Sequence, residues 1–404
     1  MNHDQAFLVV IAGILLVGLL GEWLFTRTGI PDAVWLIAAG AGLGPITGLV
    51  QRDDLQLAGP ELGAFTIIIV LFHGGLGLPL NQLATHAWKA CKLAVLTFTV
   101  STAGVALTLL GLVRAGYLPP LWSWQLAVLA GLILGGSSSV VVMATLGFAK
   151  VEDTIAQPLN VESALTDVLV VVCTGVMVNL VVAGHLSVAD PLVGVVQNFG
   201  VGTLAGAACG LLLVLVVHLL QRSRSAYIFL LAVMLLLYAT VARLGGSPAL
   251  AVLAAAVILG NAGLVLQWLG FGDGQTKLEL GEHSIRLSQF ALFIVKALFF
   301  TFIGASLPSA PGPLAIGAVL GVVLFLLRWP ATRLALADSQ LTPAQKNVAW
   351  VSLPRGLAAG VMALVPAAAG IPGAEELQAP IFAAIASTIL IFAIGFPLAR
   401  RKKA

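Results

Sequence analysis

Charged residues are scarce in this chain. Asp, Glu, Lys and Arg make up 9% of its 404 residues, against about 25% in a typical soluble domain. Hydrophobic residues make up 59%, and apolar runs of about 18 residues or more recur from end to end, each long enough to cross a bilayer. The composition excludes a soluble globule, and the long runs exclude a porin-type barrel, whose strands are short and alternating. We therefore expect an all-α polytopic membrane protein.

Residues that build disulfides and metal centres are also few. The three cysteines, Cys91, Cys173 and Cys209, lie in apolar helical stretches, so we expect buried thiols and no disulfide framework. The six histidines show no metal-ligand spacing, and we expect no cofactor. The net charge of +3 comes from basic residues that sit mainly at helix ends, which gives no indication of nucleic-acid binding.

The apolar runs divide the chain into thirteen expected spans. They lie near residues 6–26, 30–50, 62–80, 88–113, 124–148, 155–183, 190–220, 225–242, 246–264, 285–307, 313–336, 346–370 and 379–399. The N-terminus lacks a basic region and a cleavage site, so the first span should be retained, and we expect no soluble domain after the last one.

An odd number of spans places the termini on opposite sides of the membrane. If the C-terminal "ARRKKA" is cytoplasmic, fourteen basic residues fall inside and three outside. This bias fits the positive-inside rule. We expect an integral protein, in a prokaryotic inner membrane, with its N-terminus outside and its C-terminus in the cytoplasm.

Two acidic residues interrupt the sixth span, "NVESALTDVLVVV". An ionised side chain at mid-membrane costs at least about 2.5–3.5 kcal/mol, so such residues are usually paired or functional. Glu162 and Asp167 are five residues apart, which places them about 140° apart around a helix. Ser163 shares the face of Asp167, and Thr166 adjoins it. We favour one carboxylate as a cation site with hydroxyl neighbours and the other in an ion pair; two structural ion pairs are the alternative.

Other acidic residues lie in or near the spans. Asp32 and Glu61 are at span ends, where we expect solvated interfacial roles. Glu22 lies near the end of the first span, where a structural role is expected.

Two further spans contain helix-breaking residues. "LGGSSSVVVMATLG" (134–147) combines a glycine pair with three serines, and "SLPRGLAAG" (352–360) combines proline, arginine and two glycines. Unwound backbone within a membrane is tolerated where it lines a cavity, and such breaks occur at corresponding positions of inverted repeats. These are the fifth spans of the first six and of the last six, so we expect two inverted six-helix repeats with broken, crossing helices 5 and 12.

Basic residues within spans are the remaining candidates. Lys296 can repel a substrate or sense pH, or it can snorkel to the interface or pair with an acid such as Glu22. His73, near one end of the third span, is a possible modulator of pH response.

Several segments together resemble the monovalent cation/proton antiporters, the broad family of sodium/proton exchangers. The similarity covers nearly the whole chain, and it is carried by "RTGIPDAVWLIAAGAGLGP" (27–45), "LFHGGLGLPLNQL" (71–83), "VESALTDV" (161–168), "GGSPALAVLAAAVILGN" (245–261), "LFFTFIGASL" (298–307), "LFLLRWPATR" (324–333) and "SLPRGLAAGVMALVP" (352–366). Its acidic motif is similar to that of the largely electroneutral branch, although Thr166 replaces the usual asparagine.

The resemblance implies roles for individual residues. Asp167 is implied to bind the monovalent cation or proton, Glu162 to pair with Arg328, and Arg355 to compensate charge at the break in helix 12. Ser137, Ser138 and Ser139 replace the family's threonine–aspartate–proline run. Together with Thr166 and Ser163, these serines are candidate oxygen ligands.

The resemblance also implies function and domain organisation. We expect a transporter and not an enzyme, one that exchanges Na⁺ or K⁺ for H⁺ with electroneutral 1:1 stoichiometry by alternating access. Residues 1–80 and 223–307 would form a scaffold for homodimerisation in the lipid bilayer, 81–183 and 308–404 a mobile core, and 184–222 a linker. A cation channel or proton-coupled symporter is the alternative. An intramembrane hydrolase is remote, because the chain has no His-Glu-x-x-His or Gly-x-Gly-Asp motif.

Overall fold

A computed structural model describes residues 3–49, 52–77, 80–119, 122–182, 190–220, 226–268, 270 and 282–401. All regular elements among these residues are helices. The chain divides into two compact units. The first comprises Met1–Gly63, Ala87–Val178 and Lys296–Ala404, and the second comprises Ala64–His86 and Asn179–Val295.

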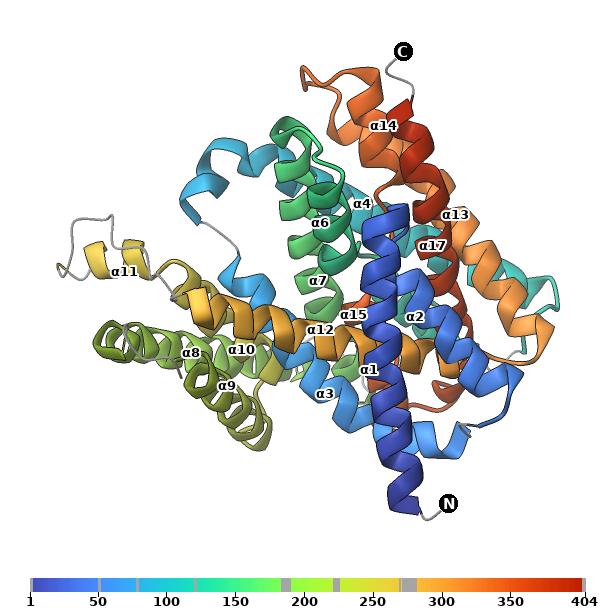
Figure 1. Cartoon of the computed structure of the whole chain (residues 1–404), viewed down its shortest axis with the longest axis horizontal. Helices are drawn as coiled ribbons and strands as arrows, with labels where there is room; N and C mark the ends of the chain where they lie inside the picture. The colour runs from blue at the N-terminus through green and yellow to red at the C-terminus, as the bar shows by residue number, and fades with distance from the viewer. Residues whose placement is uncertain are drawn as a thin grey trace. The chain divides into compact units, whose positions relative to one another are not determined.

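The first unit contains most of the helices. They are α1 (His3–Thr28), α2 (Asp32–Ala41), the π-helix η1 (Gly42–Ile46), the start of α3 (Arg52–Leu76), most of α4 (Leu80–Arg114), α5 (Trp124–Ile133), α6 (Ser139–Phe148), most of α7 (Asp153–Val182), the end of α12 (Glu282–Ala305), α13 (Pro311–Ala335), α14 (Pro343–Val351), α15 (Leu357–Met362), α16 (Val365–Ala368) and α17 (Glu375–Arg401). The start of α1 and the end of α17 lie at opposite ends of the view in Figure 1.

The second unit is built around three helices that run side by side in Figure 1. They are α8 (Asp190–Leu220), α9 (Ala226–Arg243) and α10 (Pro248–Gly260), which is followed by α11 (Ala262–Trp268). Gly202, Gly206 and Gly210 repeat every four residues along α8, and a Cβ at any of them would come within 3.0 Å of α10 or of Ser247, the residue that precedes it. The two helices pack closely because small residues let their backbones approach, as in other membrane helix pairs.

Seven of the described helices are long and apolar enough to cross a membrane, or eight if α10 and α11, which bend by 74°, form one broken span. The second, third, fifth and twelfth predicted spans contain shorter apolar helices, among them Asp32–Ile46, Glu61–Leu76 and Leu357–Ala368. The structure therefore supports a polytopic helical membrane protein, and the count of thirteen spans stays a prediction.

The fifth predicted span is interrupted at the glycine and serine cluster. Helix α5 ends at Ile133 and α6 begins at Ser139. Ser138 caps α6, because its hydroxyl accepts a hydrogen bond from the Val141 N–H at 3.4 Å. A Cβ at Gly136 would lie 2.7 Å from the Thr166 carbonyl oxygen. Glycine at this position therefore allows the unwound backbone to lie directly against α7.

The twelfth predicted span is interrupted in the same way. Helix α14 ends at Val351, and α15 begins at Leu357. Pro354 lies in the gap and has no N–H to continue a helix. The extended residue Gly356 precedes α15.

Three expectations about individual residues need correction. The three cysteines are free but half-buried, so their thiols are not enclosed as expected. Asp32 is buried and does not face solvent, since it forms an ion pair with Lys296. Lys296 does pair with an acid, as in one of the alternatives above, but the acid is Asp32 on α2 and not Glu22, which is exposed. Asp32 opens α2, where the helix dipole also favours a negative charge, so both features offset the cost of burying it.

Candidate functional site

The two helix breaks meet in the first unit. The Ser138 N–H, in the first break, donates a hydrogen bond of 2.7 Å to the Pro354 carbonyl in the second. A Cβ on Gly356 would lie 2.0 Å from the Ser138 hydroxyl oxygen. The contact requires a glycine at position 356, because any side chain there would collide with Ser138. The hydrogen bond gives the unpaired N–H of one break a partner in the unpaired carbonyl of the other.

Asp167 lies on α7 beside the first break. Its side chain is buried, with the residue 7% exposed. Its Oδ2 accepts two hydrogen bonds from Ser139, one from the backbone N–H at 3.1 Å and one from the hydroxyl at 2.5 Å. Because Ser139 is the first residue of α6, the carboxylate lies at a helix N-terminus, which favours negative charge. The Oδ1 atom accepts no hydrogen bond from the described residues, so one carboxylate oxygen is free to bind a cation or a proton.

Glu162 and Arg328 form a fully buried ion pair. The guanidinium of Arg328, on α13, donates from Nη1 to Glu162 Oε1 at 2.9 Å and from Nη2 to Oε2 at 2.8 Å. Its Nε donates to the Ala349 carbonyl at 3.1 Å. Glu162 Oε1 also accepts from the Thr97 and Ser137 hydroxyls at 3.1 and 3.3 Å. A bidentate pair with its remaining groups satisfied is the arrangement that best offsets the cost of burying two charges.

The other hydroxyl candidates gather around Ser137. The Ser137 hydroxyl lies 3.1 Å from the Ser163 hydroxyl and 3.4 Å from the Thr166 hydroxyl. The Ser137 N–H donates to Thr166 Oγ1 at 3.1 Å. The hydroxyls of Ser163 and Thr166 therefore lie against Ser137, which in turn donates to Glu162. The hydroxyl that reaches Asp167 is that of Ser139.

Arg355 lies in the second break and is fully buried. Its Nη2 donates to the Ser101 hydroxyl at 3.2 Å, and its backbone N–H donates to Thr388 Oγ1 at 3.1 Å. Its Nε and Nη1 have no hydrogen-bond partner among the described residues. The guanidinium is near enough to interact electrostatically with both Asp167 and Glu162. It thus supplies a positive charge close to the two acids without forming an ion pair with either.

Sequence reasoning missed two partners on α4. Thr97 donates to Glu162, and Ser101 accepts from Arg355. The two residues are four positions apart, so they share one face of the helix. This spacing of buried hydroxyls within an apolar helix was a usable signal.

His73 and the predicted metal-binding capacity of the chain are the remaining points. His73 lies at the end of α3 in the second unit, and its role stays a prediction. Among the described residues, no three His, Cys, Asp or Glu side chains gather as a metal site. A multidentate site of the kind that holds a resident divalent metal is therefore not found in the part of the chain that the structure covers.

Comparison with solved structures identifies the fold. Over 99% of the chain the structure matches the sodium proton antiporter MjNhaP1 from Methanocaldococcus jannaschii at pH 8, with a TM-score of 0.76 and 18% identity, covering 97% of that protein. A second structure of MjNhaP1, from an electron-microscopy map, matches with a TM-score of 0.75 and 17% identity. At this identity the likeness concerns the fold alone.

Comparison of sequences identifies the family. The chain is 28% identical over 393 residues to the K⁺/H⁺ antiporter NhaP2 of Shewanella oneidensis, covering 93% of this chain and 63% of that protein. It is 26% identical over 407 residues to the K⁺/H⁺ antiporter NhaP of Alkalimonas amylolytica, covering 97% of this chain and 66% of that protein. The chain thus spans less than two thirds of the length of these relatives. The model of the transmembrane sodium/hydrogen exchangers matches residues 7–400, and the chain therefore belongs to the sodium/hydrogen exchanger family.

Proposed function

We propose that this protein is a secondary active transporter that exchanges Na⁺ or K⁺ for H⁺ at Asp167. The observation that carries the proposal is the state of that carboxylate: it is buried, held through Oδ2 by Ser139, and free of hydrogen bonds at Oδ1 among the described residues. The relatives' names include both Na⁺ and K⁺, so both cations stay in the proposal.

Competition for one carboxylate is sufficient for exchange. A proton on Oδ1 neutralises Asp167, and so does a bound monovalent cation, but the two cannot occupy the group together. The hydroxyl of Ser139 can rotate its proton away and offer its oxygen to a cation. Ser138 and the backbone carbonyls freed at the breaks are the next candidate ligands. Thr166, Ser163 and Ser137 support the site from the side of Glu162.

A single titrating group implies 1:1 exchange without net charge movement. The site moves one way with a proton and returns with one cation of equal charge. The Glu162–Arg328 pair is neutral, and the charge of Arg355 moves out and back, so both contribute nothing over a full cycle. Each uncompensated charge would instead perform work of about 2.3 kcal/mol per 100 mV.

Reconstituted vesicles test the stoichiometry. At equilibrium we expect a tenfold gradient of the transported cation to be balanced by a pH gradient of about one unit. Because the two ions carry equal charge, a clamped membrane potential should not shift this balance. A fluorescent pH probe inside vesicles, read at several imposed potentials, makes the measurement.

The same vesicles separate exchange from its alternatives. A pH balance that moves with the potential would contradict 1:1 exchange. A cation current without proton movement would indicate a channel. Proton and cation movement in the same direction would indicate a symporter.

We also propose thirteen spans, in two inverted repeats of six joined by a linker span, residues 184–222. The two breaks at corresponding positions of the repeats support this arrangement. The proposed scaffold and dimer interface is 1–80 with 223–307, and the proposed mobile core is 81–183 with 308–404. The basic residues near the predicted inner ends of the spans support a cytoplasmic C-terminus and an inner-membrane location.

The contact between the breaks gives a further prediction. Replacing Gly356 by alanine would place a Cβ 2.0 Å from the Ser138 hydroxyl oxygen and 2.3 Å from its Cβ, and Ser138 is held by Pro354. We expect the breaks to separate and exchange to slow by about tenfold or more, since small misplacements at a site have large effects on rate. Gly175→Ala on α7, with no atom within 4 Å of the new Cβ, is the matched control. Unchanged exchange in Gly356→Ala would mean that the spacing of the breaks does not limit transport.

A further inference from the structure

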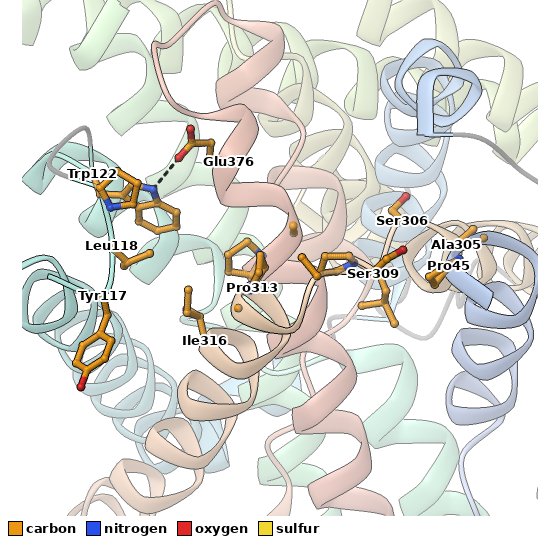
Figure 2. Close-up of a pocket in the computed structure, with 18 residues that line it drawn as sticks. Pro45, Tyr117, Leu118, Trp122, Ala305, Ser306, Ser309, Pro313, Ile316 and Glu376 are labelled. Atoms are coloured by element: carbon orange, nitrogen blue, oxygen red, sulfur yellow. Dashed lines mark hydrogen bonds between the residues drawn. The ribbon is translucent and has the colours of Figure 1, made fainter. Parts of the chain in front are cut away.

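A cavity lies in the first unit, away from the carboxylates described above. It has a volume of about 660 Å³ and is lined by residues from the end of η1, the connection between α4 and α5, the end of α12, and the starts of α13 and α17. Figure 2 shows its lining side chains spread between Trp122 and Glu376 at one end and Ser306 and Pro45 at the other. None of its lining residues belongs to the Asp167 or Glu162 network, so it is a separate candidate site.

The walls of this cavity are largely apolar. Leu118, Ile316 and Ala379 are among its apolar lining residues, and five prolines line it as well. The ring of proline fixes φ, so the backbone is locally constrained at these five positions. The apolar lining suits a hydrocarbon body.

One charged group faces this apolar space. Glu376 is the only carboxylate among the described lining residues, and no Lys or Arg lines the cavity among them. The indole Nε1 of Trp122 donates a hydrogen bond of 3.1 Å to Glu376 Oε2. Trp122 is buried, 4% exposed, so it positions the carboxylate of Glu376, which is itself exposed at the end of the cavity. A ligand that combines a positive charge and N–H donors with an apolar body complements these features.

The cavity also lies at the level where helices end. It is formed where α12 stops and where α13 and α17 start, and Tyr117 at its edge is 78% exposed. Tyrosine and tryptophan are enriched at the membrane–water interface, at the depth of lipid headgroups. The bilayer is therefore the nearest source of a suitable ligand.

We propose that this cavity binds an aminophospholipid through its primary ammonium headgroup. The ammonium donates hydrogen bonds to Glu376, and hydrocarbon of the lipid lies along Leu118, Pro313 and Ile316. A hydrated metal ion gains nothing from the apolar walls, and an anionic headgroup without an amine is repelled by Glu376. A choline headgroup carries the charge but has no N–H donor, so it binds more weakly.

The test measures binding to the purified full-length protein in detergent by native mass spectrometry. The probes are phosphatidylethanolamine, phosphatidylcholine with the same acyl chains, and dodecylamine. We expect the ethanolamine lipid to bind at least about tenfold more tightly than the choline lipid. Glu376→Gln should remove this preference, because the amide keeps the Trp122 hydrogen bond but loses the charge.

Two further variants keep the result interpretable. Glu375→Gln removes the neighbouring carboxylate, which is exposed like that of Glu376 but does not line the cavity, and should leave the preference unchanged. Ile316→Trp fills the cavity while retaining Glu376, and should weaken binding of the ethanolamine lipid. Equal binding of both lipids by the wild type, or a preference that survives Glu376→Gln, would overturn the proposal. Tight binding of dodecylamine without preference between the lipids would overturn the lipid as the source of the amine.

Discussion

Asp167→Asn is expected to reduce cation/proton exchange to the background of protein-free vesicles. Asparagine has nearly the same shape and can still accept the hydrogen bonds from the Ser139 N–H and hydroxyl. It neither binds a proton at physiological pH nor carries the charge that attracts a cation. The variant should therefore lose both substrates while the contact between α6 and α7 persists.

Folding and transport must be measured together for this variant. Thermal unfolding in detergent should show a stability equal to or above that of the wild type, because a buried charge that no other charge directly pairs with has been removed. Asp153→Asn, at the exposed start of the same helix, is the matched control and should exchange normally. Exchange that persists in Asp167→Asn would show that another group carries the proton, and the proposed function would fall.

The second large effect is expected at the buried ion pair. Arg328→Met leaves Glu162 charged, buried and without its partner, and Glu162→Gln does the same to Arg328. Removing one partner of a buried pair costs about 3–5 kcal/mol. We expect either single variant to lower the melting temperature and the yield of monodisperse protein, and to slow exchange as a consequence.

The double variant separates pairing from the loss of either residue. Glu162→Gln combined with Arg328→Met removes both charges and should be more stable than either single variant, because replacing a buried pair by neutral groups is often tolerated. Asp338→Asn breaks the Lys92–Asp338 pair, in which the Asp338 side chain is 89% exposed, and should change stability little. A double variant as unstable as the sum of the two single variants would show that the charges do not stabilise the fold through each other.

The helical framework was largely accessible from the sequence. Crossing the hydrocarbon of a bilayer requires long apolar helices, so the apolar runs predicted the helices. A charge within a membrane is costly, so the charged residues inside these runs, Glu162, Asp167, Arg328 and Arg355, were predicted to be paired or functional. The glycine, serine and proline clusters predicted the interruptions, because these residues weaken or end helices. The pairing of Glu162 with Arg328 came from a family resemblance, since no spacing along the chain indicates a partner 166 residues away.

The sequence did not indicate which hydroxyl group binds which carboxylate. The periodicity of α7 placed Ser163 on the face of Asp167, whereas the Ser163 hydroxyl contacts Ser137. The direct partner of Asp167 is Ser139, which lies on another helix. Likewise, Asp32 was expected at a solvated span end, but it is buried against Lys296.

The order of amino acids was enough to predict a helical membrane protein with two interrupted spans and a few costly buried charges. Composition and local backbone preference decide these features, and both can be read residue by residue. The folded arrangement was needed to show that Ser139 holds Asp167, that Ser101 holds Arg355, and that the two breaks touch at Ser138 and Pro354. These contacts depend on how helices distant in the sequence pack together, and small residues such as Gly136 and Gly356 permit that packing without specifying their partners.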